Sequence, residues 1–209
     1  MINCSHILTT TLHSATMDDF EIIKQLGIGN FSSVKLVRLR SSFYRRRNIP
    51  SKETSKIDTL FALKCFKNKN GADDGVDLKQ MMQDEKEITS SMDSPFIIKY
   101  FGEINHASKT YFILEALLGG DLYKLLSEQK RFQDDWVRFY AASVLSAFTE
   151  IHSKHVAYRD LKPENLIIGS TGYIKLIDFG LAKKVENGKT FTCCGTVSSL
   201  SNDLNFPSF

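Results

Sequence analysis

The stretch "YRDLKPEN", Tyr158–Asn165, decides the fold of this chain. It holds a carboxylate, an amine and a carboxamide at fixed offsets, and a second carboxylate follows in "DFG", Asp178–Gly180. Phosphoryl transfer needs a carboxylate for the proton of the attacking hydroxyl, a cation beside the moving group and oxygen ligands for Mg²⁺. A polar surface loop with a chance turn is disfavoured, because both motifs are complete and in order. The residues that supply the required groups are Asp160, Lys162, Asn165 and Asp178.

The composition is that of an ordinary globular protein. The chain has 209 residues, 42% of them hydrophobic and 24% charged. The net charge of +3 is small and its cations are mixed with acids, which predicts no nucleic-acid partner. Four cysteines without metal-binding spacing favour reduced thiols and a cytoplasmic location. No run approaches the roughly 20 apolar residues of a transmembrane helix.

Short runs of β-forming residues begin at Phe20. The runs "FEIIKQL", "SSVKLVRLR" and "LFALKCF" predict three antiparallel strands, and "FIIKYFGEI" and "TYFILEAL" predict two more. Residues 40–59 are polar and basic, which predicts a long exposed loop. Apolar spacing predicts helices over 76–92 and 135–152, and a shorter helix near Asp121. A β-rich first half with one main helix and a helical second half predict two unlike lobes of an α+β fold.

With these motifs in place, the chain resembles the eukaryotic Ser/Thr protein kinases. The resemblance is to the AGC group, which includes the cyclic-nucleotide-dependent and phosphoinositide-dependent kinases, since "YRD" stands where most kinases have "HRD". It implies a bilobal protein-kinase-like fold with an incomplete helical C-lobe. The implied divisions are a flexible tail over 1–16, an N-lobe over 17–114 with the basic loop 40–59, the C-lobe portion 115–196 and an unmatched tail over 197–209.

The resemblance also implies roles for the motif residues. Asp160 would be the catalytic base, Lys162 would contact the transferred phosphate, and Asn165 with Asp178 would hold Mg²⁺. Lys64 would hold the ATP phosphates and pair with a helix glutamate, for which Glu85 is favoured over Glu87. For two of the ATP-binding segments a structural alternative stays open. The run "LGIGNFSSV" is also compatible with an ordinary hairpin, and Asp121 with an ordinary helix cap. The implied ATP-binding set is Leu26, Gly27, Gly29, Val34, Ala62, Lys64, Leu114, Glu115, Leu117 and Asp121.

Two further segments predict interactions with other proteins or with membranes. Thr192 corresponds to the family's activation-segment threonine, so we expect an upstream kinase whose phosphate would pair with Arg159 and Lys183. Arg45 to Arg47, with Lys52 and Lys56, form a basic group that is able to dock an acidic partner or a membrane headgroup, although a merely solvated loop is favoured.

The resemblance ends after Thr196. The Pro-Glu-Tyr and Ala-Pro-Glu runs expected next are absent, and 197–209 resembles a shifted reading frame, a retained intron or an alternative exon. We therefore expect a C-terminally truncated catalytic domain that transfers phosphate from Mg-ATP to a protein Ser/Thr hydroxyl weakly or not at all by itself. The alternative is a non-catalytic nucleotide-binding regulator or truncated isoform.

Overall fold

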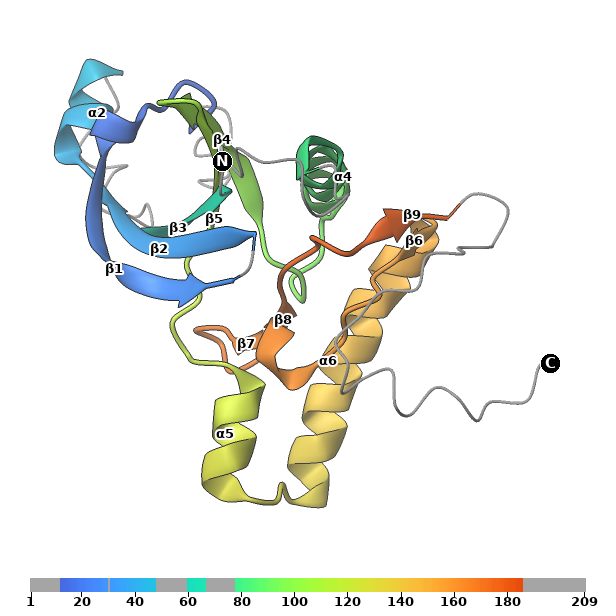
Figure 1. Ribbon diagram of the computed structural model, residues 1–209. Helices are drawn as coiled ribbons and strands as arrows, with labels where there is room; N and C mark the ends of the chain where they lie inside the picture. Colours follow the sequence, from blue (N-terminus) through green and yellow to red (C-terminus); the bar gives the residue numbers. More distant parts are fainter. Residues whose placement is uncertain (1–11, 30, 48–59, 67–77, 186–209) are drawn as a thin grey trace, which may run out of the picture. The chain divides into compact units, whose positions relative to one another are not determined.

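Strands and helices gather in separate parts of the chain in the computed structural model. It describes residues 12–29, 31–47, 60–66 and 78–185 (Figure 1). The first unit comprises Met1–Val76 with Lys99–Ala116, and the second comprises Asp77–Ile98 with Leu117–Phe209. The described part of the first unit is mainly a β-sheet, and that of the second carries three longer helices, so the predicted α+β class is confirmed.

The first unit contains a five-stranded antiparallel sheet with the order β1-β2-β3-β5-β4. All five strands predicted from the sequence are present. Side chains alternate between the two faces of a sheet, so the register decides which residues share a face. The strand bounds are β1 (Phe20–Ile28), β2 (Ser32–Leu39), β3 (Leu60–Phe66), β4 (Tyr100–His106) and β5 (Lys109–Glu115).

One face of this sheet carries the core of the first unit. Phe61 and Leu63 are buried there with Ile113, which lies opposite Leu63 on the neighbouring strand. The ring of Phe61 makes edge contacts with Phe20 and Phe101, at centroid distances of 6.2 and 5.3 Å. These large apolar groups, removed from water, supply the main stabilisation of the sheet.

The segment before β1 belongs to the fold, which corrects the prediction of a flexible tail over 1–16. Leu12 is fully buried in the core and Ala15 is nearly so. A short 3₁₀ helix, η1 (Met17–Asp19), follows, and its Asp19 accepts a hydrogen bond of 2.9 Å from the backbone N–H of Thr16. Residues 12–16 are therefore fixed by burial and by this turn, while 1–11 lie outside the described residues.

A second correction concerns the basic segment 40–59, predicted to be an exposed loop. Its first part forms the helix α2 (Ser41–Arg46), beside β1 and β2 in Figure 1. Phe43 is fully buried and Tyr44 is 6% exposed, because both join the core of the sheet. Two adjacent aromatic residues within a polar, basic segment are the sequence feature that indicates this burial. Residues 48–59 lie outside the described residues.

Arginine side chains fasten α2 to the segment that precedes β1. Arg46 forms an ion pair with the fully buried Asp19. Arg47 donates a hydrogen bond of 2.6 Å to the Ser14 carbonyl, and its guanidinium lies 3.9 Å from the centroid of the Phe43 ring. A charge such as that of Asp19 is tolerated inside a fold only when it is paired, so this contact fixes α2 and η1 together.

The second unit contains three longer helices, α4 (Leu78–Ser91), α5 (Leu122–Gln129) and α6 (Asp134–Ser153). The ends of α4 and α6 lie within two residues of the predicted ends. The helix α5 begins just after Asp121, where a short helix was predicted. The buried positions of α6 are Ser143, Ala147 and Ile151, which are spaced by four and share one face. No helix in the described part of the chain is both long and apolar enough to cross a membrane.

Two short hairpins complete the described part of the second unit. β6 (Val156–Ala157) pairs with β9 (Lys183–Lys184), and β7 (Leu166–Ile168) pairs with β8 (Ile174–Leu176). The Ile98 N–H donates to the Leu176 carbonyl at 3.0 Å. This strand-like contact explains why 77–98, predicted as part of the N-lobe, groups with the second unit. The last boundary between the units along the chain, at 116–117, lies close to the predicted boundary at 114–115.

The burial of Phe43 predicts a large effect of truncation in α2. Phe43→Ala should destabilise the first unit by about 3 to 5 kcal/mol, because it leaves a cavity in the core. Ile28→Ala is the matched control: Ile28 is 75% exposed, and its loss should cost less than about 0.5 kcal/mol. Hydrogen exchange of the β2 and β3 amides measures the loss of stability in each variant. Equal exchange rates in the two variants would contradict the role of Phe43 in stabilising the first unit.

Gly119 and Gly120 are expected to differ for distinct physical reasons. A β-carbon on Gly119 would lie 2.4 Å from the Ile168 carbonyl oxygen, whereas one on Gly120 meets no atom within 4 Å but sits at a φ of +80°. Gly119→Ala should therefore cost about 2 to 4 kcal/mol by overpacking, and Gly120→Ala only about 1 to 2 kcal/mol by backbone strain. Urea unfolding followed by the fluorescence of the single tryptophan, Trp136 in α6, measures the order, and the reverse order would refute the clash.

Candidate active site

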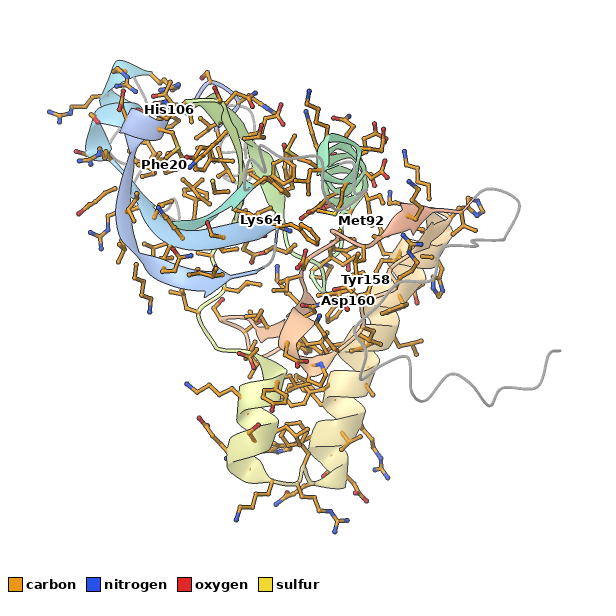
Figure 2. All side chains as sticks on the ribbon, viewed as in Figure 1. Phe20, Lys64, Met92, His106, Tyr158 and Asp160 are labelled. Carbon is orange, nitrogen blue, oxygen red and sulfur yellow. The ribbon has the colours of Figure 1, made fainter. Side chains whose placement is uncertain are left out.

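Four of the residues predicted to bind ATP share one face of the first unit's sheet. Val34 lies opposite Lys64, and Ala62 lies opposite Leu114, in the registers of β2 with β3 and of β3 with β5. Ala62 and Lys64 are two residues apart on one strand, so all four side chains project to the same side. This face is opposite to the one that carries Phe61 and Leu63. It offers apolar contacts and one ammonium group, which Figure 2 labels at Lys64.

The turn between β1 and β2 has an open backbone at its first glycine. A β-carbon on Gly27 would meet no atom of the described residues within 4 Å, so none of them fills the space beside it. The Gln25 side chain donates to the carbonyls of Gly27 and Val34, at 2.6 Å each, and so ties the two strands together. The Gly29 N–H donates to the Ser32 carbonyl at 2.8 Å. An open, tethered backbone of this kind leaves room for a ligand to approach the chain closely.

The end of β5 is fixed to the start of β4. The Glu115 N–H donates to the Lys99 carbonyl at 2.9 Å, and the Glu115 carboxylate accepts from the Lys99 N–H at 3.3 Å. Leu117 begins the second unit. Contacts of Glu115 and Leu117 with adenine stay predictions.

Asp121 caps the helix α5. Its carboxylate accepts a hydrogen bond of 2.7 Å from the Lys124 N–H, so the alternative reading of a helix cap is confirmed. A contact of Asp121 with ribose stays a prediction. Leu26, at 39% exposed, is the most open of the predicted apolar ATP contacts on the sheet.

The predicted catalytic loop is held together by its own polar side chains. The Asn165 Nδ2 donates to the Asp160 backbone carbonyl at 2.9 Å and to Asp160 Oδ2 at 2.8 Å. The Lys162 ammonium lies 2.8 Å from the same Oδ2. Asp160 and Asn165 are both buried. The structure therefore brings the predicted carboxylate, amine and carboxamide into one cluster.

The second predicted carboxylate lies next to this cluster. The Ile177 N–H donates to the Asn165 carbonyl at 2.9 Å, and the β7–β8 pairing holds this link in register. Asp178 follows directly, in the left-handed backbone region with a φ of 57°. Aspartate is among the few residues that occupy this region, where backbone strain is often found at functional sites.

Asn165 and Asp178 suit the metal that the resemblance implies. Mg²⁺ prefers oxygen ligands and is usually held by one or two protein groups together with water and substrate phosphates. The Asn165 amide nitrogen faces Asp160, so its oxygen is directed away from that carboxylate. Among the described residues there is no group of three or more His, Cys, Asp or Glu side chains fit for a metal. A two-ligand site of amide and carboxylate oxygen thus fits Mg²⁺ completed by a nucleotide.

Tyr158 connects the two motifs, a role that sequence reasoning missed. Its hydroxyl donates to the Ile177 carbonyl, and its buried ring makes an edge contact with Phe179 at 5.2 Å. Burial, and then the charges of Asp178 and Asp160, raise the pKa of the Tyr158 phenol well above its ordinary value. The phenol therefore stays a hydrogen-bond donor. Figure 2 labels Tyr158 and Asp160 in the second unit.

Glu85 of α4 lies beside the glycine of "DFG". A β-carbon on Gly180 would be 3.2 Å from Asp178 Oδ1 and 3.4 Å from Glu85 Oε2. Glu85 is buried, whereas Glu87 is exposed and pairs with Lys184 at 3.1 Å. The preference for Glu85 as the inward-facing glutamate is therefore supported. Its pairing with Lys64 joins residues of different units and stays a prediction.

Two ion pairs connect α4 to β9. The Lys183 ammonium lies 2.7 Å from the Asp84 carboxylate, parallel to the Glu87–Lys184 pair. Burial alone would raise the pKa of Asp84, but hydrogen bonds from Lys183 and Gln80 outweigh it and lower the pKa below 3.8. A lowered carboxylate pKa adds stability above the ordinary pKa, and this stability is lost as the pH falls through the lowered value.

The predicted phosphothreonine contacts are engaged within the second unit. Lys183 pairs with Asp84, and the Arg159 Nε donates to the Leu181 carbonyl at 2.8 Å. Thr192 lies outside the described residues, so its phosphorylation stays a prediction.

Comparison with known proteins agrees with this arrangement. The family model described as a protein kinase domain matches residues 20–204, so part of 197–209, predicted to be unmatched, is matched. Human cGMP-dependent protein kinase 2 is 38% identical over 186 residues, which are 88% of this chain and 22% of that protein. cAMP-dependent protein kinase type 3 of Saccharomyces cerevisiae is 35% identical over 191 residues, which are 90% of this chain and 43% of that protein.

The chain thus spans less than half the length of either relative. The family model covers most of its residues. The chain therefore belongs to the protein kinase family, within the AGC group that contains the cGMP- and cAMP-dependent kinases.

Proposed function

We propose that this chain is an ATP-dependent protein Ser/Thr kinase catalytic domain, with the sequence-predicted residues in their predicted roles. The observation that carries the proposal is the Asn165 side chain, which donates to both the backbone and the carboxylate of Asp160. Through its own carbonyl, Asn165 also accepts from Ile177, the residue before Asp178. Asn165, itself a candidate metal ligand, thus links the candidate base to the residue before the second candidate ligand, Asp178.

The residues of the loop divide the chemistry between them. Asp160, oriented by Asn165 and Lys162, accepts the proton of the attacking Ser or Thr hydroxyl. Lys162, 2.8 Å from that carboxylate, places positive charge where the phosphoryl group moves. Asn165 and Asp178 hold Mg²⁺, which when bound neutralises charge on the ATP phosphates.

The sheet of the first unit binds the nucleotide. Val34, Ala62 and Leu114 supply an apolar surface for adenine, and Lys64 on the same face binds the phosphates. The open backbone at Gly27 allows the phosphates close to the chain. Specificity for Ser or Thr rather than Tyr rests on the "YRD" and "KPEN" runs and on the relatives named above. The cytoplasmic location predicted from the sequence stays a prediction.

The base is tested by Asp160→Asn in the full chain. Phosphate transfer from Mg-ATP to a basic Ser/Thr peptide should fall by about 10² to 10⁴ fold, because the variant cannot accept the hydroxyl proton. Asp135→Asn is the matched control, since this α6 carboxylate is 92% exposed and lies outside the catalytic loop. Transfer measured with radiolabelled ATP should be unchanged in the control.

Two outcomes would contradict the proposal. Transfer that survives Asp160→Asn would remove Asp160 from the role of base. Mg-ATP that raises the melting temperature of the unaltered chain, with no transfer at any peptide concentration, would favour the non-catalytic nucleotide-binding regulator instead.

Tyr158→Phe tests the positioning of the two motifs. The variant leaves the Ile177 carbonyl without its phenol donor, so the loop that holds Asp178 should loosen. We expect kcat to fall about threefold to tenfold with little change in the KM for ATP. The pH–rate profile should keep its shape below about pH 10, because the phenol does not titrate there. Tyr123→Phe, at a 54% exposed residue of α5, is the control and should behave like the unaltered chain.

A further inference from the structure

The first unit contains a hollow of about 620 Å³ that the proposed kinase chemistry does not use. It lies where β2 ends and α2 begins, at the opposite end of the β1–β2 hairpin from the Gly27 turn. Polar side chains dominate its wall, among them Glu21, Arg38, Arg40, Ser41, Ser42 and Arg45. We call it the arginine hollow.

The arginine hollow carries an excess of positive charge. Among the described residues, three arginines and one acidic residue, Glu21, line it. The Arg38 guanidinium lies 3.6 Å from Glu21, with both side chains about half exposed, so this ion pair is weak and exchangeable. An anion that enters is therefore attracted without having to break a strong internal pair.

The fold holds the Arg40 side chain and the backbone of Arg45. Arg40 donates through its Nε to the Phe20 carbonyl at 3.3 Å, and its own backbone N–H donates to the Asp19 carbonyl at 2.8 Å. Arg45 is carried by α2, which the buried Phe43 and Tyr44 anchor in the core. A site whose groups are fixed before binding loses less conformational freedom when the ligand arrives.

The chemistry of the wall matches a phosphate monoester. All the cationic residues on the wall are arginines, whose planar forks bind phosphate oxygens in pairs, whereas lysine offers a single point charge. Ser41 and Ser42 add hydroxyl groups that are able to donate to the remaining oxygens. The sequence alone favoured a solvated basic loop that includes Arg45, but in the structure Arg45 lines the hollow together with Arg38 and Arg40.

We propose that the arginine hollow binds a phosphorylated serine or threonine side chain in a peptide segment of a partner protein. Glu21 favours a peptide over a membrane, because its carboxylate accepts backbone N–H groups or pairs with a basic neighbour of the phosphate. The proposal concerns docking of a partner and does not depend on the catalytic proposal.

The test is fluorescence anisotropy with the full chain and a labelled peptide, Ala-Lys-Ala-phosphothreonine-Ala-Gly, against its unphosphorylated twin. The phosphopeptide should bind saturably and at least about tenfold tighter, since each charge-assisted contact adds affinity of that order. Arg45→Gln should weaken it at least about threefold, and Arg40→Gln with Arg45→Gln at least about tenfold. Arg138→Gln is the matched control, because this arginine is 78% exposed on α6, and it should bind like the unaltered chain.

Three results would overturn the proposal. The first is equal affinity for the two peptides. The second is unchanged phosphopeptide affinity in Arg45→Gln, a variant of an exposed side chain that leaves Phe43 and Tyr44 in the core. The third combines equal binding of the two peptides with binding of the chain to phosphatidylcholine vesicles that contain about 5% phosphatidylinositol bisphosphate, measured by sedimentation. If Arg45→Gln abolishes that vesicle binding, the hollow is assigned to a membrane headgroup.

Discussion

The predicted catalytic loop of the second unit depends on one carboxamide. Asn165 donates from a single nitrogen to the Asp160 backbone and carboxylate, and its main-chain carbonyl accepts from Ile177. The side-chain bonds fix the loop internally, and the main-chain bond fixes it to the strand that leads to Asp178. Because these groups are buried, an unpaired partner would be costly, so the contacts favour one arrangement of the loop. Apolar packing around Tyr158 and Phe179 then closes the cluster.

Much of the fold and of the candidate site could be predicted from the sequence. The five strands follow from alternating β-forming residues, and the three longer helices follow from helical spacing of apolar residues, because both patterns are local. The site residues follow from motifs in which a few consecutive positions carry the chemistry. Glu85 was chosen over Glu87 by its place on the helix, and burial agrees with that choice.

What the sequence did not predict depends on contacts between distant residues. Leu12 and Phe43 lie in polar surroundings without periodicity, yet both are buried in the same core. Asp19 reads as an ordinary acidic residue until the ion pair with Arg46, 27 positions away, explains its burial. Likewise, 77–98 group with the second unit through backbone hydrogen bonds of Phe96 and Ile98 to Leu176. A local sequence pattern does not predict such contacts.

The tyrosine at position 158 also bears on how the predicted catalytic loop responds to acidity. An imidazole in its place would gain or lose a proton close to neutrality, so its hydrogen bonds would change across the ordinary range of cellular conditions. A phenol whose pKa is raised keeps its proton throughout that range. The attachment of the "YRD" segment to the strand before "DFG" is therefore expected to hold equally well in mildly acidic and in neutral solution.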